Sequence, residues 1–284
     1  MNDGVLLLLK PPGCSSHDVA QLMRRRLGVP CGHLGTLDPL AAGLLVVAAG
    51  RATRLVRYAE GRDKEYVAEI WLGLETQSQD FAGPAVERVD ASRIARADVE
   101  SALAAEMQAT EQRPPAFSAR QVDGERAYHA ARQGRSLELP ARPARLHEAQ
   151  ILDIEAGAVM RIRLRLLVSA GYYVRALARD LGLRLGVGGV LAALLRTASG
   201  PFTLAGARTV EEEPELLAAD LLVAHLPRLD LSEAEGRRLS YGQRLPGAGE
   251  RQGTLAAYAD GRLVAVVNAR NGVYHPETVL AMEA

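Results

Sequence analysis

The stretch GHLGTLDPLAAG, residues 32–43, places a single carboxylate, Asp38, inside a glycine-rich loop. Pro39 follows and pushes the Asp38 backbone away from helical dihedrals, toward an extended or turn conformation. The next six residues, LLVVAA at 44–49, are all apolar, which indicates a buried strand. A rigid strand can hold such a loop while a ligand still reaches it. Two interpretations stay open: a site for chemistry, or a turn in which the aspartate bonds its own backbone.

The overall composition is that of an ordinary globular chain. It has 284 residues, 48% hydrophobic and 24% charged, and a formal net charge of +0. This length fits one large domain or two. No apolar run approaches the roughly 20 residues that span a bilayer, and the start lacks the basic segment of a signal peptide. We therefore expect a cytoplasmic protein. Cys14 and Cys31 predict two reduced thiols, without a disulfide framework or a metal cluster.

The cations are almost all arginines, since Lys10 and Lys64 are the only lysines. Arginine suits phosphate because its planar fork donates two hydrogen bonds at once. A compositional bias of the source genome explains the ratio equally well. Arginines gather at 24–26 and again between 113 and 145. The first group lies near the expected end of a helix, where cations favour the helix dipole, so RNA is not needed to explain it.

Local patterns predict both strands and helices. The strands are expected at 5–9, 44–49, 64–73, 146–154 and 159–168. The helices are expected at 17–27, 52–58, 97–107, 127–133, 176–185 and 190–195. Arginines 161, 163 and 165 alternate with apolar residues, which favours one solvated sheet face, with an RNA-facing sheet as the lesser alternative. A hairpin around Asp260-Gly261 predicts a small all-β unit over 229–284.

Six separated motifs, in this order, resemble the TruB family of tRNA pseudouridine synthases. They are KPPG at 10–13, the loop at 32–43, KEYVA at 64–68, RPPAFSA at 113–119, YHAARQG at 128–134 and GYYVR at 171–175. The resemblance continues through 180–182 and 194–196 and covers about residues 5–205. The C-terminal unit matches more weakly. Because six ordered motifs rarely coincide by chance, the signal is specific.

The resemblance implies an α+β fold with a mixed, largely antiparallel central sheet flanked by helices. Residues 1–228 would form the catalytic domain, with an RNA-gripping insertion at about 113–142, and residues 229–284 a PUA-like RNA-binding domain. The family isomerises uridine 55 of the tRNA T loop to pseudouridine. It uses no cofactor and no metal. The expected partner is the T-arm stem-loop of tRNA, with no membrane and no obligate protein partner, so we expect a monomer.

The resemblance also implies roles for single residues. Asp38 would be the catalytic aspartate, Tyr66 would stack on the target base and assist proton removal, and Arg175 would pair with Asp38. Four further residues would line the nucleotide site or support the first loop: His33, Tyr173, Leu194 and Lys10. Without the resemblance, Tyr66 is an ordinary strand tyrosine, Arg175 a helix-start surface residue and Leu194 a core residue.

The chemistry fits these roles. Exchanging a C–N for a C–C glycosidic bond needs an ionised carboxylate, either as nucleophile or to stabilise positive charge on the ribose. An adjacent arginine favours the ionised form of a carboxyl group by opposite charge. The target uridine must be flipped out of its stack, and flat side chains can receive it.

The chain departs from the family pattern at four positions. Leu34 and Ala42 stand where the family usually has threonine. Tyr172 also replaces a usual threonine, which puts a hydroxyl role there in doubt. Leu195 replaces an arginine and removes one possible phosphate contact. RNA binding would then rest more on the insertion and the C-terminal unit.

Three other functions remain open. The first is a non-catalytic tRNA-folding chaperone on the same scaffold. The second is the related guide-RNA-dependent class, which shares the aspartate loop and works with partner proteins. The third is a glycosidase or nucleotide hydrolase that uses Asp38, although the sequence pairs no second acid with it.

Overall fold

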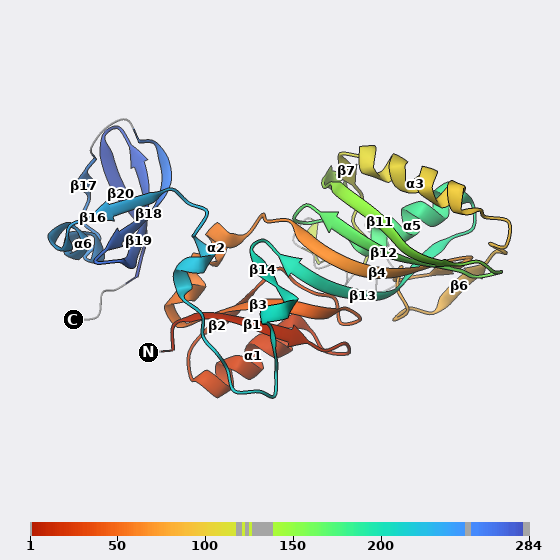
Figure 1. Cartoon of the computed structure of the whole chain (residues 1–284), viewed down its shortest axis with the longest axis horizontal. Helices are drawn as coiled ribbons and strands as arrows, with labels where there is room; N and C mark the ends of the chain where they lie inside the picture. Colours follow the sequence, from red (N-terminus) through yellow and green to blue (C-terminus); the bar gives the residue numbers. More distant parts are fainter. Residues whose placement is uncertain (1, 118–120, 123–124, 127–138, 248–250, 281–284) are drawn as a thin grey trace.

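A computed structural model of the chain describes residues 2–117, 121–122, 125–126, 139–247 and 251–280 (Figure 1). The molecule is elongated, with a small β unit at one end and helices α3 and α5 at the other. A large mixed sheet runs between them. The predicted α+β architecture with a largely antiparallel sheet is therefore confirmed. Cys14 and Cys31 are both free thiols, as predicted.

The large sheet has the path β11-β12-β4-β13-β3-β1-β15. Neighbours along it are antiparallel except for the pairs β13–β3 and β1–β15. Its strands are β1 (Gly4–Lys10), β2 (Cys31–Leu34), β3 (Ala42–Ala49), β4 (Lys64–Leu72), β11 (Leu146–Glu155), β12 (Met160–Val168), β13 (Gly189–Ser199), β14 (Phe202–Thr203) and β15 (Arg208–Thr209).

Three helices cover this sheet. Helix α1 (Ser16–Leu27) starts at the N-cap Ser15, whose hydroxyl accepts from the Asp18 N–H in a capping box. It packs on β1 and β3. Helices α3 (Arg96–Gln108) and α5 (Val174–Leu185) bury one face of β4 and β12 in the largest core. We call this the inner face, and the opposite, partly exposed side of the same strands the outer face.

One predicted helix is wrong. The apolar run at 190–195 forms the middle of strand β13, which pairs with β4 on one side and β3 on the other. A strand at the centre of a sheet is apolar on both faces, and a short apolar run of this kind cannot be distinguished from a buried helix by periodicity. The predicted helix at 127–133 lies outside the described residues.

Shorter elements connect these parts. The 3-10 helix η1 (Gly50–Leu55) and the helix α2 (Val56–Ala59) occupy the predicted helical segment 52–58. Three small hairpin-like pairs follow: β5 (Leu74–Thr76) with β6 (Ala85–Arg88), β7 (Glu111–Gln112) with β10 (Arg142–Pro143), and β8 (Gln121–Val122) with β9 (Glu125–Arg126). The pair β8–β9 lies within the segment predicted as the insertion, and the pair β7–β10 joins the two ends of that segment.

The C-terminal unit is a five-stranded sheet with one short helix, α6 (Glu233–Ser240), against it. Its strands are β16 (Arg228–Leu231), β17 (Leu245–Pro246), β18 (Gly253–Ala259), β19 (Arg262–Arg270) and β20 (Val273–Val279). The predicted hairpin is confirmed, because Asp260 and Gly261 both take positive φ, at 50° and 71°, between β18 and β19. Helix α2 attaches this unit to the body, where the Tyr58 and Thr278 hydroxyls lie 2.9 Å apart.

Candidate active site

Hydrogen bonds from the start of α1 and the turn before it hold the backbone of the Asp38 loop. The Ser16 hydroxyl accepts from the Leu37 N–H at 2.8 Å, and the Gly13 N–H donates to the Pro39 carbonyl at 2.8 Å. Leu37 is 2% exposed and anchors the loop in the core. The Asp38 side chain itself is 35% exposed, so a held backbone presents a reachable carboxylate.

At one position of this loop, Gly43, only glycine fits sterically. A Cβ atom on Gly43 would lie 2.4 Å from the Arg196 carbonyl oxygen, and Gly43 has φ of +107°. Strands β3 and β13 pair there in parallel, and only glycine permits this approach and this dihedral. The end of the Asp38 loop is thereby joined to β13.

Arg175 lies at the start of α5 and makes a two-pronged contact with Asp38. Its Nε donates to Oδ2 at 2.8 Å, and its Nη2 donates to Oδ1 at 3.0 Å. The arginine side chain is only 5% exposed. Its remaining donors reach the Ser78 carbonyl at 3.1 Å and the Phe117 carbonyl at 3.0 Å. Such a planar fork fixes both the position and the orientation of the carboxylate.

A second carboxylate, Asp80, also faces Arg175, and sequence reasoning missed it. Its Oδ2 lies 3.6 Å from the Arg175 Nε, and its side chain is 7% exposed. The Ser78 hydroxyl and the Ala82 N–H both donate to Oδ1. The segment containing Asp80 looks in the sequence like a polar turn, which gives no sign that it reaches a residue 95 positions away. Arg175 is therefore held between two carboxylates.

A cavity of about 310 Å³ opens beside this pair. Among the residues expected at the site, five line it: Asp38, Tyr66, Tyr173, Arg175 and Leu194. Tyr66 comes from β4 and Leu194 from the neighbouring β13, and both are largely buried on the inner face. The cavity lies at the lower end of the range for ligand pockets, about 300–1,000 Å³, which suits one nucleotide.

His33 and Lys10 do not line this cavity. Lys10 is fully buried, and its ammonium donates to the carbonyls of Pro11 and Cys14 at 2.8 and 2.7 Å. It therefore braces the turn that follows β1. His33 lies on β2, and its buried Nδ1 has no hydrogen-bond partner in the part of the chain that the structure describes. Burial lowers the pKa of His33, and nearby Arg196 lowers it further.

The two departures nearest the cavity differ in their effect. Tyr172 lines it, and its buried hydroxyl lacks a hydrogen-bond partner among the described residues. Burial raises the pKa of this phenol, which stays protonated. Leu195 is absent from the cavity wall and alternates with Leu194 along β13. Side chains alternate between the faces of a strand, so Leu195 points to the outer side.

Gln112, at the root of the insertion, is a further residue that the sequence did not single out. Its side-chain amide donates to the Tyr173 carbonyl at 3.1 Å and accepts from the Tyr173 N–H at 2.8 Å. Tyr173 is the N-cap of α5, two positions before Arg175. The Arg179 side chain also reaches back to the Arg113 carbonyl at 3.0 Å. The root of the insertion thus holds the start of the helix that carries Arg175.

Within the described residues, no group of three or more histidine, cysteine, aspartate or glutamate residues could hold a metal ion. No helix among those same residues is long and apolar enough to cross a membrane.

Two family models match the chain. One, described as "TruB family pseudouridylate synthase (N terminal domain)", matches residues 24–174, and the other, "tRNA Pseudouridine synthase II, C terminal", matches residues 226–281. Both models describe pseudouridine synthases, and this class fits the mixed sheet and the Asp38 cavity. The first match spans more than half of the chain. The chain therefore belongs to the TruB family of pseudouridine synthases.

Curated relatives match over most or all of their length. The chain is 41% identical to "tRNA pseudouridine synthase B" of Thermobifida fusca, covering 99% of both chains. It is 40% identical to the protein of the same name from an Arthrobacter species, covering 99% of this chain and 97% of the relative. A third, from Symbiobacterium thermophilum, is 46% identical over 84% of this chain and 82% of the relative.

Solved structures show the same fold. The chain matches one from a "Cbf5-Nop10-Gar1 Complex" with a TM-score of 0.70 and 27% identity, covering 99% of this chain and 84% of the other. It also matches a chain of an "H/ACA RNP bound to a substrate RNA containing 2'-deoxyuridine", with a TM-score of 0.71 and 24% identity, covering 98% of this chain and 85% of the other. At that identity the second likeness concerns the fold alone.

Proposed function

We propose that this chain isomerises uridine to pseudouridine at position 55 in the T loop of tRNA. The observation that carries the proposal is the Asp38 carboxylate, gripped by Arg175 at the mouth of a nucleotide-sized cavity, in a chain of this family. Full-length relatives named tRNA pseudouridine synthase B support the choice of tRNA. Residues 1–228 then form the catalytic domain, with the insertion at about 113–142, and residues 229–284 the RNA-binding unit.

The reaction is an internal rearrangement that needs no oxidant, reductant or cofactor. The glycosidic bond from the ribose to N1 of uracil breaks, the base turns, and a bond from the ribose to C5 forms. The proton on C5 is lost and N1 gains one, so atoms and electrons balance. Asp38 supplies the negative charge, as a nucleophile or as a stabiliser of positive charge on the sugar. Arg175 keeps the Asp38 carboxylate in one orientation.

The other residues receive the flipped nucleotide. Tyr66 offers its ring to the base and is the candidate to assist removal of the C5 proton. Tyr173 and Leu194 close the walls of the same cavity. His33 and Lys10 act beside it: His33 on the strand leading into the loop, and Lys10 as a brace of the neighbouring turn. Flipping a base out of a folded loop costs a few kcal/mol, which contacts to the RNA backbone must offset.

The chain acts alone and in the cytoplasm in this proposal, whereas the solved structures of similar fold contain further protein partners. The test is to incubate the purified chain with an unmodified T-arm stem-loop and to assay pseudouridine at the target position. A stem-loop with cytidine at that position is the control. Conversion by the chain alone is the expected result. Conversion only after partner proteins or a guide RNA are added would assign the chain to the guide-dependent class.

A further inference from the structure

Within the described residues, two cations in the wall of the Asp38 cavity have no carboxylate partner. Lys64 precedes Tyr66 by two residues on β4, and Arg196 follows Leu194 by two on β13, so both share the inner face with those residues. Arg196 is 1% exposed, which is rare for an arginine without an acidic partner. No salt bridge joins either side chain to an acidic residue within the described part of the chain.

The neutral carbonyl groups around Arg196 use only part of its donor capacity. Its Nε donates to the Leu44 carbonyl at 2.7 Å, and its Nη2 donates to the Gly35 carbonyl at 3.0 Å. These contacts hold the two ends of the Asp38 loop. Nη1 has no partner among the described residues. Lys64 likewise donates to a carbonyl, that of Arg62.

The two positive groups lie close together. A Cβ atom built on Gly35 would be 3.3 Å from the Arg196 Nη1 and 3.6 Å from the Lys64 Cε. Both distances start from one point, so the two atoms are no more than about 6.9 Å apart, the sum of the two. Like charges at this spacing repel in a partly dry site. Burial lowers the pKa of Lys64, and Arg196 lowers it further. Fully buried Lys10 adds a third positive charge that senses Arg196.

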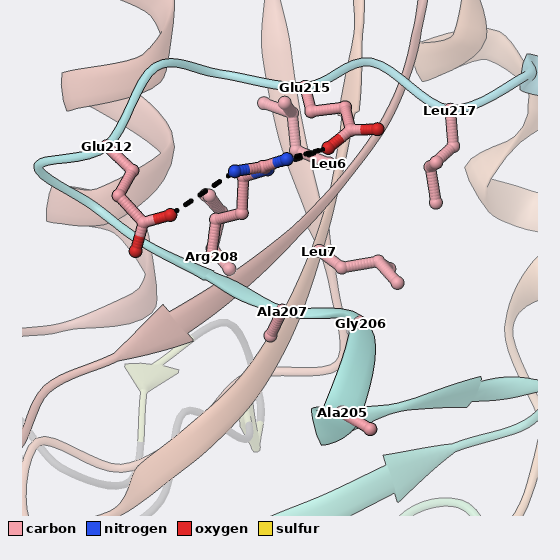
Figure 2. Close-up of a pocket in the computed structure, with 10 residues that line it drawn as sticks. Leu6, Leu7, Ala205, Gly206, Ala207, Arg208, Glu212, Glu215 and Leu217 are labelled. Atoms are coloured by element: carbon pink, nitrogen blue, oxygen red, sulfur yellow. Dashed lines mark hydrogen bonds and ion pairs between the residues drawn. The ribbon is translucent and has the colours of Figure 1, made fainter.

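Another arginine in a cavity wall shows the usual solution. Figure 2 shows a second cavity, of about 470 Å³, between β1 and the segment 205–217. Its Arg208 is held by two glutamates, with Nε 2.7 Å from Glu215 and Nη1 3.4 Å from Glu212. The positive charge of Arg208 is matched within the chain. Among the described residues that line the Asp38 cavity, Asp38 is the only carboxylate, and Arg175 already engages it. Asp63 and Glu60, which are not part of this wall, attract Lys64 and offset only part of the lowering of its pKa.

We propose that Lys64 and Arg196, with the side-chain-free Gly35 between them, bind one backbone phosphate of the nucleotide that enters the cavity. The inference rests on the proposed function, because it names the part of the RNA that this wall recognises. A phosphodiester carries the negative charge that the two cations lack in the free protein. Any side chain at position 35 would occupy the gap between them. A phosphate held there fixes the ribose relative to Asp38 and favours an RNA chain over a free nucleoside.

The test combines neutral RNA linkages with a charge variant. A series of T-arm stem-loops carries one uncharged methylphosphonate in turn at each phosphate near the target uridine. We expect one of these positions to weaken binding by wild-type protein about tenfold, as for the loss of a charge-assisted contact. Lys64→Met should weaken binding of the natural RNA by a similar factor. The methylphosphonate that weakens wild-type binding should cause no further loss of affinity in this variant. Its slope of log affinity against log salt should fall by about 0.7.

Two matched variants separate charge from folding. Lys64→Arg keeps the cation and should restore most of the affinity. Arg163→Met removes an exposed arginine of β12 and should leave both the affinity and the linkage profile unchanged. The inference is overturned if no neutral linkage affects wild type, or if every linkage affects Lys64→Met as much as wild type. Absence of pseudouridine with wild type and natural RNA would instead overturn the proposed function.

Discussion

Strand β4 carries opposite kinds of charge on its two faces. On the outer face, Glu65 accepts from Arg165 of β12 and from the Thr197 hydroxyl of β13. Close by, the Arg161 guanidinium lies 3.5 Å from Glu155 and stacks 4.5 Å from the centre of the Trp71 ring. Each of these two arginines is paired with a glutamate of the same chain. Arg161 and Arg165 are thus paired within the protein and Arg163 is exposed, so this face is a solvated surface, as the alternation in the sequence favoured.

The inner face of the same strand is different. Lys64 and Tyr66 point into the Asp38 cavity, where the cations outnumber the carboxylates available to them. Surface pairs such as those of the outer face contribute little to stability, whereas buried charges without partners are costly. A protein retains such a cost where it serves function. The site therefore differs from the surface in having cations without matching carboxylates, and not in the number of its charged residues.

Apart from the loss of Asp38 itself, the largest expected effect comes from removing the cation that both carboxylates share. Arg175→Met leaves Asp38 and Asp80 facing each other without compensation. We expect kcat to fall by about 10³-fold or more and the free energy of unfolding to fall by about 3 kcal/mol. Arg175→Lys keeps the charge without the two-pronged geometry and should recover only part of both losses. Single-turnover kinetics measure the loss of rate, and denaturant titration measures the loss of unfolding free energy. A rate for Arg175→Met within tenfold of wild type would refute the assigned role of Arg175.

A smaller loss is expected from Asp80. Asp80→Asn keeps the shape and the hydrogen bonds from Ser78 and Ala82, but removes the second negative charge beside Arg175. We expect kcat to drop about 10- to 100-fold with little change in RNA affinity, because the guanidinium is then less firmly held. Asp90→Asn, in an exposed turn, is the matched control and should behave as wild type. An unchanged kcat in Asp80→Asn would show that the charge of this aspartate does not contribute to catalysis.

Next in size is the amide that holds the start of α5. Gln112→Ala removes two hydrogen bonds to the Tyr173 backbone, and we expect about 1–2 kcal/mol of lost stability with about a tenfold lower kcat. Gln112→Glu still accepts from the Tyr173 N–H but brings a carboxylate against its carbonyl. It should therefore be no better than the alanine variant. Full activity in Gln112→Glu would show that this contact does not position Arg175.

The pH dependence of stability should reveal His33. Burial lowers its pKa, so the unfolded chain takes up a proton more readily than the folded protein as the pH falls below about 6.5. The free energy of unfolding should therefore decrease on acidification from about pH 7.5 to about pH 5.5. His33→Gln, which stays neutral, should show a weaker decrease over the same range. Parallel curves for the two proteins would mean that His33 is readily protonated in the folded state.

The smallest effect is predicted on the outer face. Arg165→Met breaks the exposed pair with Glu65, and both melting temperature and kcat should stay at wild-type values. A loss of RNA affinity in Arg165→Met like that expected for Lys64→Met would erase the contrast between the two faces and revive the alternative of an RNA-facing sheet.

Sequence patterns predicted those features that are set locally. Helix α1, the alternation along β12 and the Asp260-Gly261 hairpin all follow from neighbouring residues. Strand β13 was mistaken for a helix because its apolar run owes its form to β4 and β3 on either side. Burial on both faces overrides the periodic signal in such a strand.

The candidate site shows the same division. The family motifs led to Asp38, Tyr66 and Arg175, although they lie on separate elements. Asp80, Gln112 and Arg196 reach the site through contacts between residues far apart in the chain, such as the bond from Arg196 to the Gly35 carbonyl. No local pattern encodes those contacts, because the same sequence in another fold would place these side chains elsewhere.

The central claim is that the Asp38 carboxylate performs the reaction, whereas the surrounding cations and rings bind the RNA. The most direct measurement compares wild type with Asp38→Asn on one unmodified T-arm stem-loop, recording RNA affinity and single-turnover pseudouridine formation together. We predict a dissociation constant within about threefold of wild type and a rate at least about 10⁴-fold lower. Pseudouridine formation by Asp38→Asn at a rate near that of wild type would contradict the account.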